Sequence, residues 1–389
     1  MSNRVRLPLE GLVVVDFSTL LPGPLATEIL ASAGARIIKI EKPGKGDDMR
    51  EYEPRWGSTS ANFALLNAGK ESVAIDLKSP DVQGSIKSLI GKADVLIEQF
   101  RPGVMARLGL DYENVNRINP RIIYCSISGF GQGGPKRDTA AHDLNYIAET
   151  GLLSLSMGSL GAPVVPPALI ADIAAGSFPA VMNILIALYH RNTTGKGCYL
   201  DIAMTDALFT FHYWGIGRAQ ASGKWPRPGG ELVTGGSPRY NLYPTQDRHV
   251  VAAAPIEQKF WENFCDVIGL EYEFRHDEKN PAATLQRTRE LIGSKESTYW
   301  ASRFSGVDCC CNIVRTLEEA MNDPHFIGRG LFGTRVHGAG GVEMAALPLP
   351  LAPVFRDSGK TSSHVPSLGE HNLRVFDHAA GASSRSTIS

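Results

Sequence analysis

The stretch "LVVVDFSTLLPGPLATEILASAGARIIKIEKP" (residues 12–43) decides the fold of this chain. Its first six residues, 12–17, are a short valine-rich run, which is typical of a buried parallel strand. Residues 24–35 carry helix formers at helical spacing, and Pro24 is acceptable in a first turn. A second apolar run, 36–43, ends at a proline. We therefore predict a strand–helix–strand unit.

The same alternation continues along the chain. We predict further strands over 73–78, 94–100, 121–130 and 198–204, and helices over 81–93 and 172–192. Alternation of this kind indicates an α/β protein with a Rossmann-like, doubly wound, mostly parallel sheet.

The chain is long enough for more than one core. With 389 residues and 42.0 kDa, two domains are the natural expectation. The stretch 221–237 is rich in glycine and proline and is interpreted as a linker or mobile loop. An apolar strand at 248–254 and a helix from Glu257 open a second unit, and the extended segment 346–359 suits a return to the first domain.

Composition excludes several classes of partner. The net charge is −1, with 39 basic against 40 acidic residues and no long basic stretch, so we expect no nucleic-acid partner. No run approaches the roughly 18 apolar residues of a membrane span, and the N-terminal apolar run is too short for a signal peptide. The six cysteines form no C-x-x-C pair, so neither a zinc site nor a disulfide framework is expected. We expect a cytoplasmic protein without a membrane partner.

A glycine-rich run, 129–134, contains the pattern G-x-G-x-x-G after a predicted strand. A nucleotide fingerprint would need a helix to open from its last glycine and an acidic residue about 20 positions on. Pro135 follows instead, and no such acidic residue stands there. The run is better interpreted as a tight turn that lets a ligand approach the backbone.

Four residues at three predicted helix starts have the chemistry of acid/base catalysis. Asp143 heads a predicted helix and could be its cap, with His142 a solvated neighbour. The helix N-terminus also disfavours imidazolium, and a neutral imidazole is what a general base requires. Asp172 could likewise cap the helix that follows, but its apolar surroundings favour a raised pKa. Glu257 stands at another helix start.

Ordered blocks along nearly the whole chain resemble the family III coenzyme A transferases, a group that includes carnitine–CoA transferase, formyl-CoA transferase and α-methylacyl-CoA racemase. The blocks that carry this resemblance are "LEGLVVVDFSTLLPGPLA", "IIKIEKPGKGD", "SVAIDLKS", "ADVLIEQFRPGVMARLGL", "NPRIIYCSISGFGQGGP", "AHDLNYIAETG", "ADIAAG", "TGKGCYLDIAMTDAL" and "SLGEH".

Within this family the resemblance is greatest to the α-methylacyl-CoA racemase branch. "AHDLNY" is similar to the racemase motif that carries a catalytic histidine, which implies that His142 and Asp172 are acid/bases on opposite faces of the substrate. Glu257 would hold His142 or a water, and Asp143 would orient the loop or a backbone amide beside the oxyanion. We expect an acyl-CoA thioester as substrate, and neither a metal nor a redox cofactor.

One stretch favours the alternative, a CoA transferase. Residues 45–72 are longer than the corresponding racemase segment and resemble a transferase loop. In the transferases, an aspartate at the position of Asp172 is a nucleophile that forms an anhydride and then an aspartyl-CoA thioester. Both activities remain open at this point.

The resemblance also implies a CoA site and an assembly. Lys42 and Arg107 match positions used for the nucleotide phosphates. The remaining implied contacts along the CoA path are Leu20, Leu77, Lys78, Phe100 and Tyr146. The family forms interlocked homodimers, so we expect a discontinuous large CoA-binding domain (1–215 and 330–377), a linker and small α+β domain (216–329), and a disordered tail (378–389).

Overall fold

The computed structural model describes residues 6–156, 164–355 and 362–380. The chain divides into two compact units. The first comprises Met1–Thr150, Pro167–Thr210 and His325–Ser389, and the second Gly151–Pro166 and Phe211–Pro324. Each unit is described by itself.

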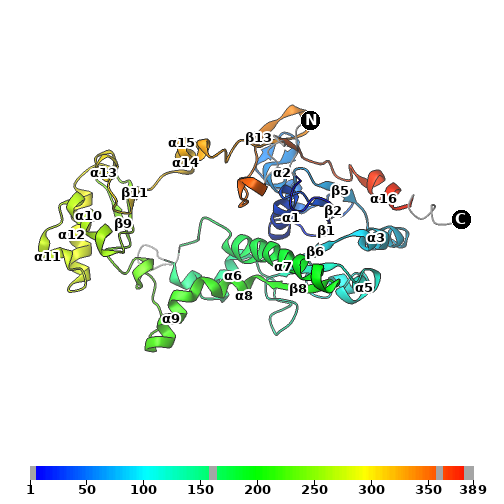
Figure 1. The fold of residues 1–389 in the computed structure, drawn as a ribbon, viewed down its shortest axis with the longest axis horizontal. Coiled ribbons are helices and arrows are strands. Elements are labelled where there is room, and N and C mark those ends of the chain that lie inside the picture. Colours follow the sequence, from blue (N-terminus) through cyan, green and yellow to red (C-terminus); the bar gives the residue numbers. More distant parts are fainter. Residues whose placement is uncertain (1–5, 157–163, 356–361, 381–389) are drawn as a thin grey trace. The chain divides into compact units, whose positions relative to one another are not determined.

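A six-stranded sheet forms the centre of the first unit (Figure 1). Its strands are β1 (Val13–Asp16), β2 (Arg36–Glu41), β5 (Glu71–Ala74), β6 (Val95–Glu98), β7 (Ile123–Ser128) and β8 (Cys198–Ala203). They lie in the order β5-β2-β1-β6-β7-β8, and every neighbouring pair is parallel. Counted along the chain, this is the order 3-2-1-4-5-6 of the Rossmann fold. The predicted fold class is confirmed.

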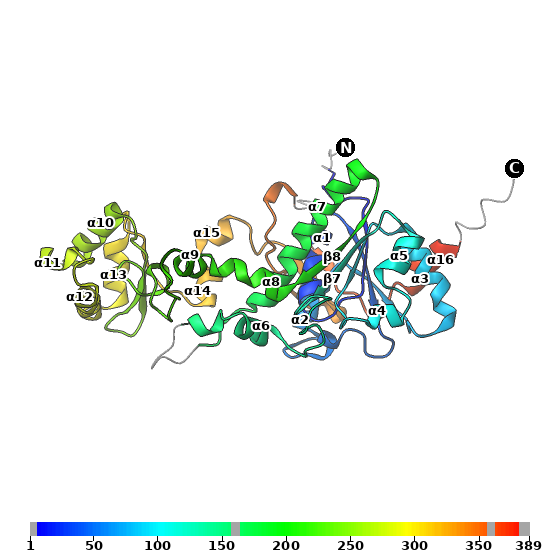
Figure 2. The ribbon, with the colours of Figure 1, turned by 90° about the horizontal axis from the view of Figure 1, so that it is seen from below.

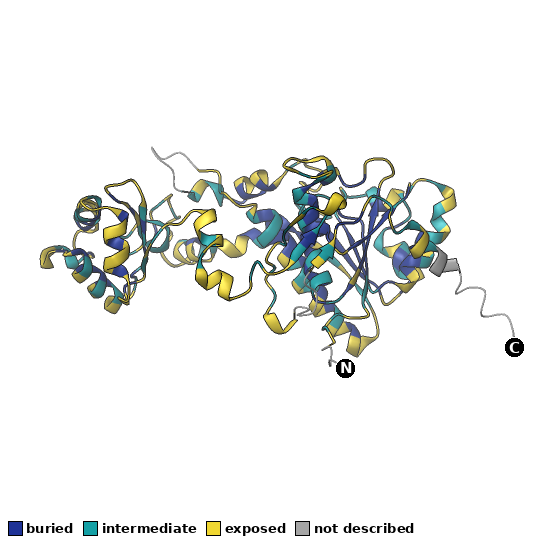
Figure 3. Ribbon diagram, turned by 90° about the horizontal axis from the view of Figure 1, so that it is seen from above, coloured by how far each residue is buried: buried dark blue, intermediate teal, exposed yellow. Residues whose placement is uncertain are grey.

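Helices cover both faces of this sheet (Figure 2). One face carries α1 (Pro22–Ser32) and α7 (Phe178–Thr194), and the other carries α3 (Pro80–Lys92), α5 (Tyr112–Ile118) and α16 (Asn372–Ala380). The inner strands β1, β2, β6 and β7 are largely buried between these layers (Figure 3), as expected for apolar strands of a parallel sheet, whereas the edge strand β8 is partly exposed. Helix α16 reaches Ala380, inside the segment expected to be disordered; residues 381–389 lie outside the described residues.

The strand order places a topological switch point between β1 and β6. The connection from β1 leads to β2 on one side, whereas β6 lies on the other side. All six strands are parallel, so their carboxyl ends meet at one edge. In such sheets, ligands bind outside this edge at the switch point. Short helices follow there: α4 (Val104–Arg107), α6 (Asp143–Glu149) and α8 (Met204–Leu208).

The helix that carries Asp172 is irregular. It begins with the π-helical turn η4 (Ala171–Ser177) and continues directly into α7. Pro179 explains the change, because its ring clashes with the carbonyl four residues earlier in a regular α-helix and it donates no hydrogen bond. The π-helical turn is wider than a regular helical turn, and it contains Asp172, the residue that the sequence suggests as catalytic.

Together, η4 and α7 form a helix of 24 residues, Ala171–Thr194, whose length and composition alone would allow it to cross a membrane. From the sequence we expected no run of the roughly 18 apolar residues that a membrane span needs. Within the hydrophobic window, 39% of the residues are buried inside the protein. The helix packs on α1, β7 and β8.

The segment between β2 and β5 folds into small elements. These are the 3-10 turn η1 (Asp48–Glu51), the hairpin β3 (Arg55–Trp56) and β4 (Thr59–Ser60), and helix α2 (Ala61–Asn67). A three-stranded sheet of β13 (Glu343–Ala345), β12 (Arg335–His337) and β14 (Ser362–His364) belongs to the same unit. Phe63 and Val336 share one apolar cluster with α1, so this segment is packed rather than a free loop.

The second unit contains an antiparallel sheet of β9 (Asn241–Pro244), β10 (Val250–Ala253) and β11 (Cys311–Ile313). Its helices are α9 (Tyr213–Ser222), α10 (Gln258–Ile268), α11 (Tyr272–Arg275), α12 (Pro281–Gly293), α13 (Ser297–Phe304) and α14 (Leu317–Met321), and α15 (Pro324–Gly328) follows. Trp261, Phe264 and Trp300 lie at the centre of a separate apolar core. An antiparallel sheet with segregated helices is the α+β arrangement expected for the small domain.

Candidate active site

A cavity of about 370 Å³ lies at the carboxyl edge of the large sheet. Its wall is built from the segments that follow β1, β6 and β7, namely Leu20 and Pro22, residues 99–102 and residues 127–130. Arg137, residues 139–142, Asn145, Tyr146, Asp172 and Met204 complete it. The volume falls in the range of small-molecule sites, and the position is the switch point between β1 and β6.

His142 reaches this cavity from the start of α6. It occupies the N-cap position in extended conformation, and its carbonyl oxygen accepts the amide of Tyr146 at 3.2 Å. Its own amide donates to Oδ1 of Asn145 at 3.0 Å. The backbone is therefore held on both sides, and the exposed imidazole is a wall of the cavity.

Tyr146 lies one turn further along α6 and is buried. Its phenol donates to the carbonyl oxygen of Ala141 at 2.8 Å, which ties the turn before His142 to the helix. Burial, followed by the charge of Asp172, raises the pKa of Tyr146 to about 12. The hydroxyl is therefore a proton donor at neutral pH. The ring packs on Gly129, where an added Cβ would lie 2.2 Å from it.

Asp172 enters the cavity from the first turn of η4. The N-cap position of that turn belongs to Ile170, so Asp172 is not a helix cap. Burial raises its pKa to about 7, and the nearby charge of Asp143 adds to the effect. At neutral pH, both the acid and the carboxylate are populated, as an acid/base catalyst requires.

Asp143 is the first residue of α6 and is 5% exposed. It does not cap its own helix. Its Oδ1 accepts a hydrogen bond from the backbone amide of Asp172 at 2.9 Å, so it connects α6 to η4. Burial raises the pKa of Asp143, although the hydrogen bonds from backbone amides oppose this.

The implied CoA contacts fall into two groups. Leu20, Phe100 and Tyr146 line the cavity together with the acid/base candidates. The other four stand outside its wall: Lys42 follows β2, Leu77 and Lys78 follow β5, and Arg107 ends α4. The strands β5, β2, β1 and β6 are consecutive neighbours, so these residues lie along one edge of the sheet.

Glu257 belongs to the second unit. It occupies the N-cap position of α10 without a side-chain capping bond, and its side chain is exposed. The other candidates, His142, Asp143 and Asp172, belong to the first unit.

Comparison with known proteins decides the family. The model for CoA-transferase family III matches residues 9–372. The chain belongs to this family. The family III chain is 32% identical to human α-methylacyl-CoA racemase over 379 residues, which cover 95% of this chain and 93% of the racemase. It is also 35% identical to acetyl-CoA:oxalate CoA-transferase of Acetobacter aceti over 358 residues, 89% of each chain.

A solved structure gives the same result. The crystal structure of a CaiB/BaiF family protein from Brucella suis superposes with a TM-score of 0.81 at 28% identity, covering 96% of this chain and 100% of that one. The family III chain is therefore an acyl-CoA enzyme of either the racemase or the transferase type.

Sequence reasoning missed two features of this family III site. Arg101 lines the cavity and is a cation close to Tyr146. Arg137, which follows the glycine run, is a second cation in the same wall. A basic residue directly after a predicted strand or a glycine turn is the signal that could have found either.

The residues described in the structure include no group of three or more His, Cys, Asp or Glu side chains placed to hold a metal ion. The wall of the cavity carries the two acid/base candidates His142 and Asp172, the tyrosine Tyr146 and two cations, Arg101 and Arg137.

Proposed function

We propose that this protein is an α-methylacyl-CoA racemase or epimerase, which inverts the α-carbon of 2-methylacyl-CoA or 2-arylpropionyl-CoA thioesters. The observation that carries the proposal is the pKa of Asp172, which burial raises to about 7 in the cavity that His142 also lines. A carboxyl group that can be an acid or a base at neutral pH suits proton transfer in both directions.

The reaction removes the proton at Cα, next to the thioester carbonyl, and returns it to the opposite face of the planar enolate. One base is needed on each face, and we assign His142 to one and Asp172 to the other. Positioned donors and positive charge must stabilise the enolate oxygen. The contact between Asp143 and the Asp172 amide supports a positioning role for Asp143. The family resemblance supports the role of Glu257 in holding His142 or a water.

We assign the CoA portion of the substrate to the carboxyl edge of the sheet. Lys42, Lys78 and Arg107 supply cations beyond the cavity, as a nucleotide with phosphates requires. Leu20, Leu77 and Phe100 supply apolar contacts along the same edge. Proton transfer of this kind needs neither a metal nor a redox cofactor.

A CoA transferase is the second candidate, and two observations favour it. Residues 45–72 fold into packed elements next to α1, as a specialised acyl pocket would require. The identity to the Acetobacter aceti transferase is also as high as that to the human racemase. In this reaction the carboxylate of Asp172 attacks the thioester carbonyl, CoA leaves as a thiolate, and CoA then attacks the aspartyl carbonyl of the anhydride to release the first acid.

We also propose that the protein is a cytoplasmic homodimer. Helix α7 exposes an apolar stripe at helical spacing: Met182 (55% exposed), Leu185 (42%), Ile186 (59%) and Tyr189 (77%). Such a stripe on a soluble protein marks an interaction surface. The interlocked dimers of the family support a second copy of the chain as its partner.

One experiment separates the two activities. The purified protein is incubated with a panel of 2-methylacyl-CoA esters in D₂O, and loss of the α-proton is followed by NMR without an added carboxylic acid. A racemase exchanges the α-proton under these conditions. Exchange or turnover only after an acceptor acid is supplied would contradict the racemase proposal.

A covalent probe gives an independent result. Hydroxylamine added during turnover should leave Asp172 unmodified if it transfers only protons. A hydroxamate at Asp172, found by mass spectrometry, would instead establish an acyl or thioester intermediate and support the transferase.

A further inference from the structure

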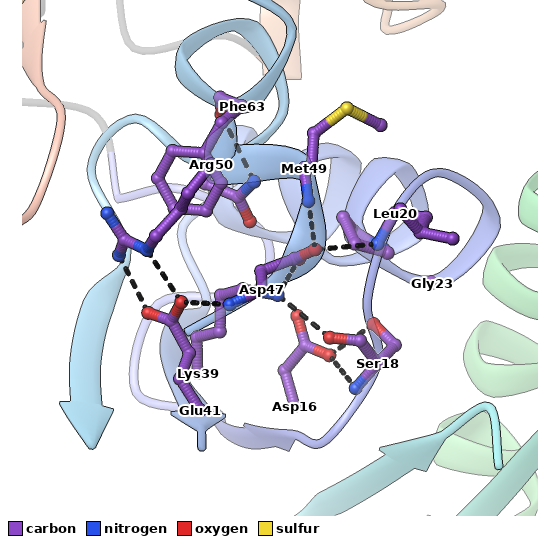
Figure 4. Close-up of polar contacts among 12 residues, drawn as sticks. Asp16, Ser18, Leu20, Gly23, Lys39, Glu41, Asp47, Met49, Arg50 and Phe63 are labelled. Carbon is purple, nitrogen blue, oxygen red and sulfur yellow. Dashed lines mark hydrogen bonds and ion pairs between the residues drawn. The ribbon is translucent and has the colours of Figure 1, made fainter. Parts of the chain in front are cut away.

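A carboxylate from outside the cavity contacts the backbone of the cavity wall (Figure 4). Asp47 lies in the segment that follows β2 and is fully buried. Its Oδ1 accepts the backbone amide of Leu20 at 3.0 Å and that of Met49 at 3.0 Å. The family resemblance did not include Asp47 among the site residues. A single side chain therefore joins the segment that carries Lys42 to the residue that begins the cavity wall.

Leu20 has an unusual backbone conformation at this contact. Its φ is +62°, in the left-handed region, which a residue with a Cβ adopts at an energetic cost. Among residues 6–156, 164–355 and 362–380, only Leu20, Arg248 and Cys310 share this property without being glycine. Strain of this kind persists only where the surroundings enforce it.

Lys39 completes the constraint from the other side. Its ammonium lies 2.9 Å from Oδ2 of Asp47 and donates to the carbonyl oxygen of Ser18 at 2.8 Å. Both charged side chains are fully buried. Burial by itself would raise the pKa of Asp47, but the Lys39 charge and the hydrogen bonds outweigh it and the pKa is lowered. The two members of one buried ion pair thus hold the chain here: Lys39 binds the carbonyl of Ser18, and Asp47 binds the amide of Leu20.

Hydrogen bonds to Glu41, at the end of β2, also hold the segment that contains Asp47. The amide of Asp47 donates to Oε2 of Glu41 at 2.9 Å, and Arg50 donates twice to the same carboxylate, at 2.7 Å each. The guanidinium of Arg50 lies 3.9 Å from the centre of the Phe63 ring. Asp47 therefore sits at a fixed position, from which it can hold Leu20.

We propose that Asp47 is a positioning residue for acyl-CoA binding: its hydrogen bond keeps Leu20 in the left-handed conformation and sets the path of the chain between β1 and α1. The same carboxylate connects this wall to the segment of Lys42, so both sides of the CoA path depend on it. The inference rests on the proposed function only in that the ligand is a CoA thioester, and it holds for a racemase and a transferase alike.

A double-mutant cycle tests this role. The variants are Asp47→Ala, Leu20→Gly and the two combined, and the measurement is the dissociation constant of CoA by calorimetry on the full chain. Glycine adopts the left-handed conformation without the Cβ cost, so it no longer needs Asp47 to enforce it. In the protein with the native Leu20, we expect Asp47→Ala to weaken CoA binding about tenfold. In the Leu20→Gly background, the same substitution should weaken CoA binding by less than about threefold.

A control variant and a second readout complete the experiment. Glu51→Gln changes an exposed carboxylate of the same segment, which lies 3.8 Å from Lys45, and should leave CoA affinity unchanged. In the proton-exchange assay, Asp47→Ala should raise KM more than it lowers kcat, because the acid/base residues are not contacted by Asp47. Should Asp47→Ala not fold, Asp47→Leu replaces it in the same cycle with the same criterion, because leucine is of similar shape and has no acceptor oxygen for the Leu20 amide.

Each result has a distinct meaning. An equal loss of CoA affinity in both backgrounds overturns the positioning role, and leaves the proposed function intact. Failure of the unaltered protein to bind CoA overturns the proposed function and this inference with it. A loss confined to the Leu20 background supports the inference.

Discussion

Asp143 and Asp172 are joined by a hydrogen bond of 2.9 Å, in which the carboxylate of the first accepts the backbone amide of the second. The two residues start different helices, 29 positions apart in the chain. The bond therefore fixes the start of η4 against the start of α6, where His142 stands. The two acid/base candidates thus share one rigid support, and the charge of Asp143 also influences the proton affinity of Asp172.

Removing either of the two proposed acid/base residues should affect the two enantiomers differently. We expect His142→Ala and Asp172→Ala each to slow racemisation by about 10²–10⁴-fold. The residue that remains can still remove and return a proton on its own side. His142→Ala should therefore exchange deuterium mainly into one enantiomer, and Asp172→Ala mainly into the other. NMR in D₂O measures this; a His142→Ala variant that racemises at the normal rate would contradict the role of His142.

The pH dependence of exchange should show the titration of Asp172. Its pKa of about 7 means that the carboxylate, which is the base, becomes the main form as the pH rises through 7. For the enantiomer whose α-proton faces Asp172, kcat/KM should increase up to that pH and be constant above it. Initial rates between pH 5 and 9 provide the test, and a flat profile would contradict the assignment.

Asp143→Asn should move this profile. The substitution keeps an oxygen acceptor for the Asp172 amide but removes a negative charge that raises the pKa of Asp172. The pKa of Asp172 should then fall, and the rising limb of kcat/KM should shift to lower pH. Asp81→Asn, an exposed aspartate at the start of α3, is the matched control and should leave the limb in place. A rising limb that stays at the same pH would show that the charge of Asp143 does not act on Asp172.

Gly129 and Gly133 belong to the same glycine run but should respond differently to a methyl group. A Cβ at Gly129 would lie 2.2 Å from the ring of Tyr146, whereas one at Gly133 meets nothing within 4 Å. We expect Gly129→Ala to lower the free energy of unfolding by about 1–3 kcal/mol and to reduce activity by displacing Tyr146 from the cavity. Gly133→Ala should do neither. Urea titrations and exchange assays on both variants decide the matter.

A charge on the exposed stripe of α7 should disrupt the proposed dimer. Ile186→Glu places a carboxylate where an apolar contact would be buried, and should convert a dimer to monomers at micromolar concentration. Asn192→Glu, at an exposed position of the same helix, is the control. Sedimentation of the unaltered protein as a monomer would remove the dimer from the proposal.

Much of the large sheet could be predicted from the sequence. The run 12–17 contains β1 (Val13–Asp16), and 36–43 contains β2 (Arg36–Glu41). Short apolar runs of β-branched residues form buried strands largely because of their local composition. The alternation of these strands with helices predicted a doubly wound, mostly parallel sheet. The order of the six strands was not predicted and came from the structure.

The predicted boundaries of strand β5 were less accurate. The predicted strand 73–78 is displaced from β5 (Glu71–Ala74), because polar Glu71 is buried in this strand. Its carboxylate pairs with Arg36 of the neighbouring strand at 2.8 Å. A charged residue is not expected in a buried strand unless its partner is known, and the partner is 35 residues away.

The sequence by itself determined the α/β class, the family and the residue types available for proton transfer, because these depend on local composition and on short ordered motifs. Only the tertiary structure decided which of these residues share a cavity. It also decided that Asp143 contacts Asp172 rather than capping its own helix, and that Asp47 holds Leu20 in a left-handed conformation. The physical reason is that a pKa, an enforced backbone angle and a buried ion pair depend on desolvation and on contacts between distant segments, which no local pattern specifies.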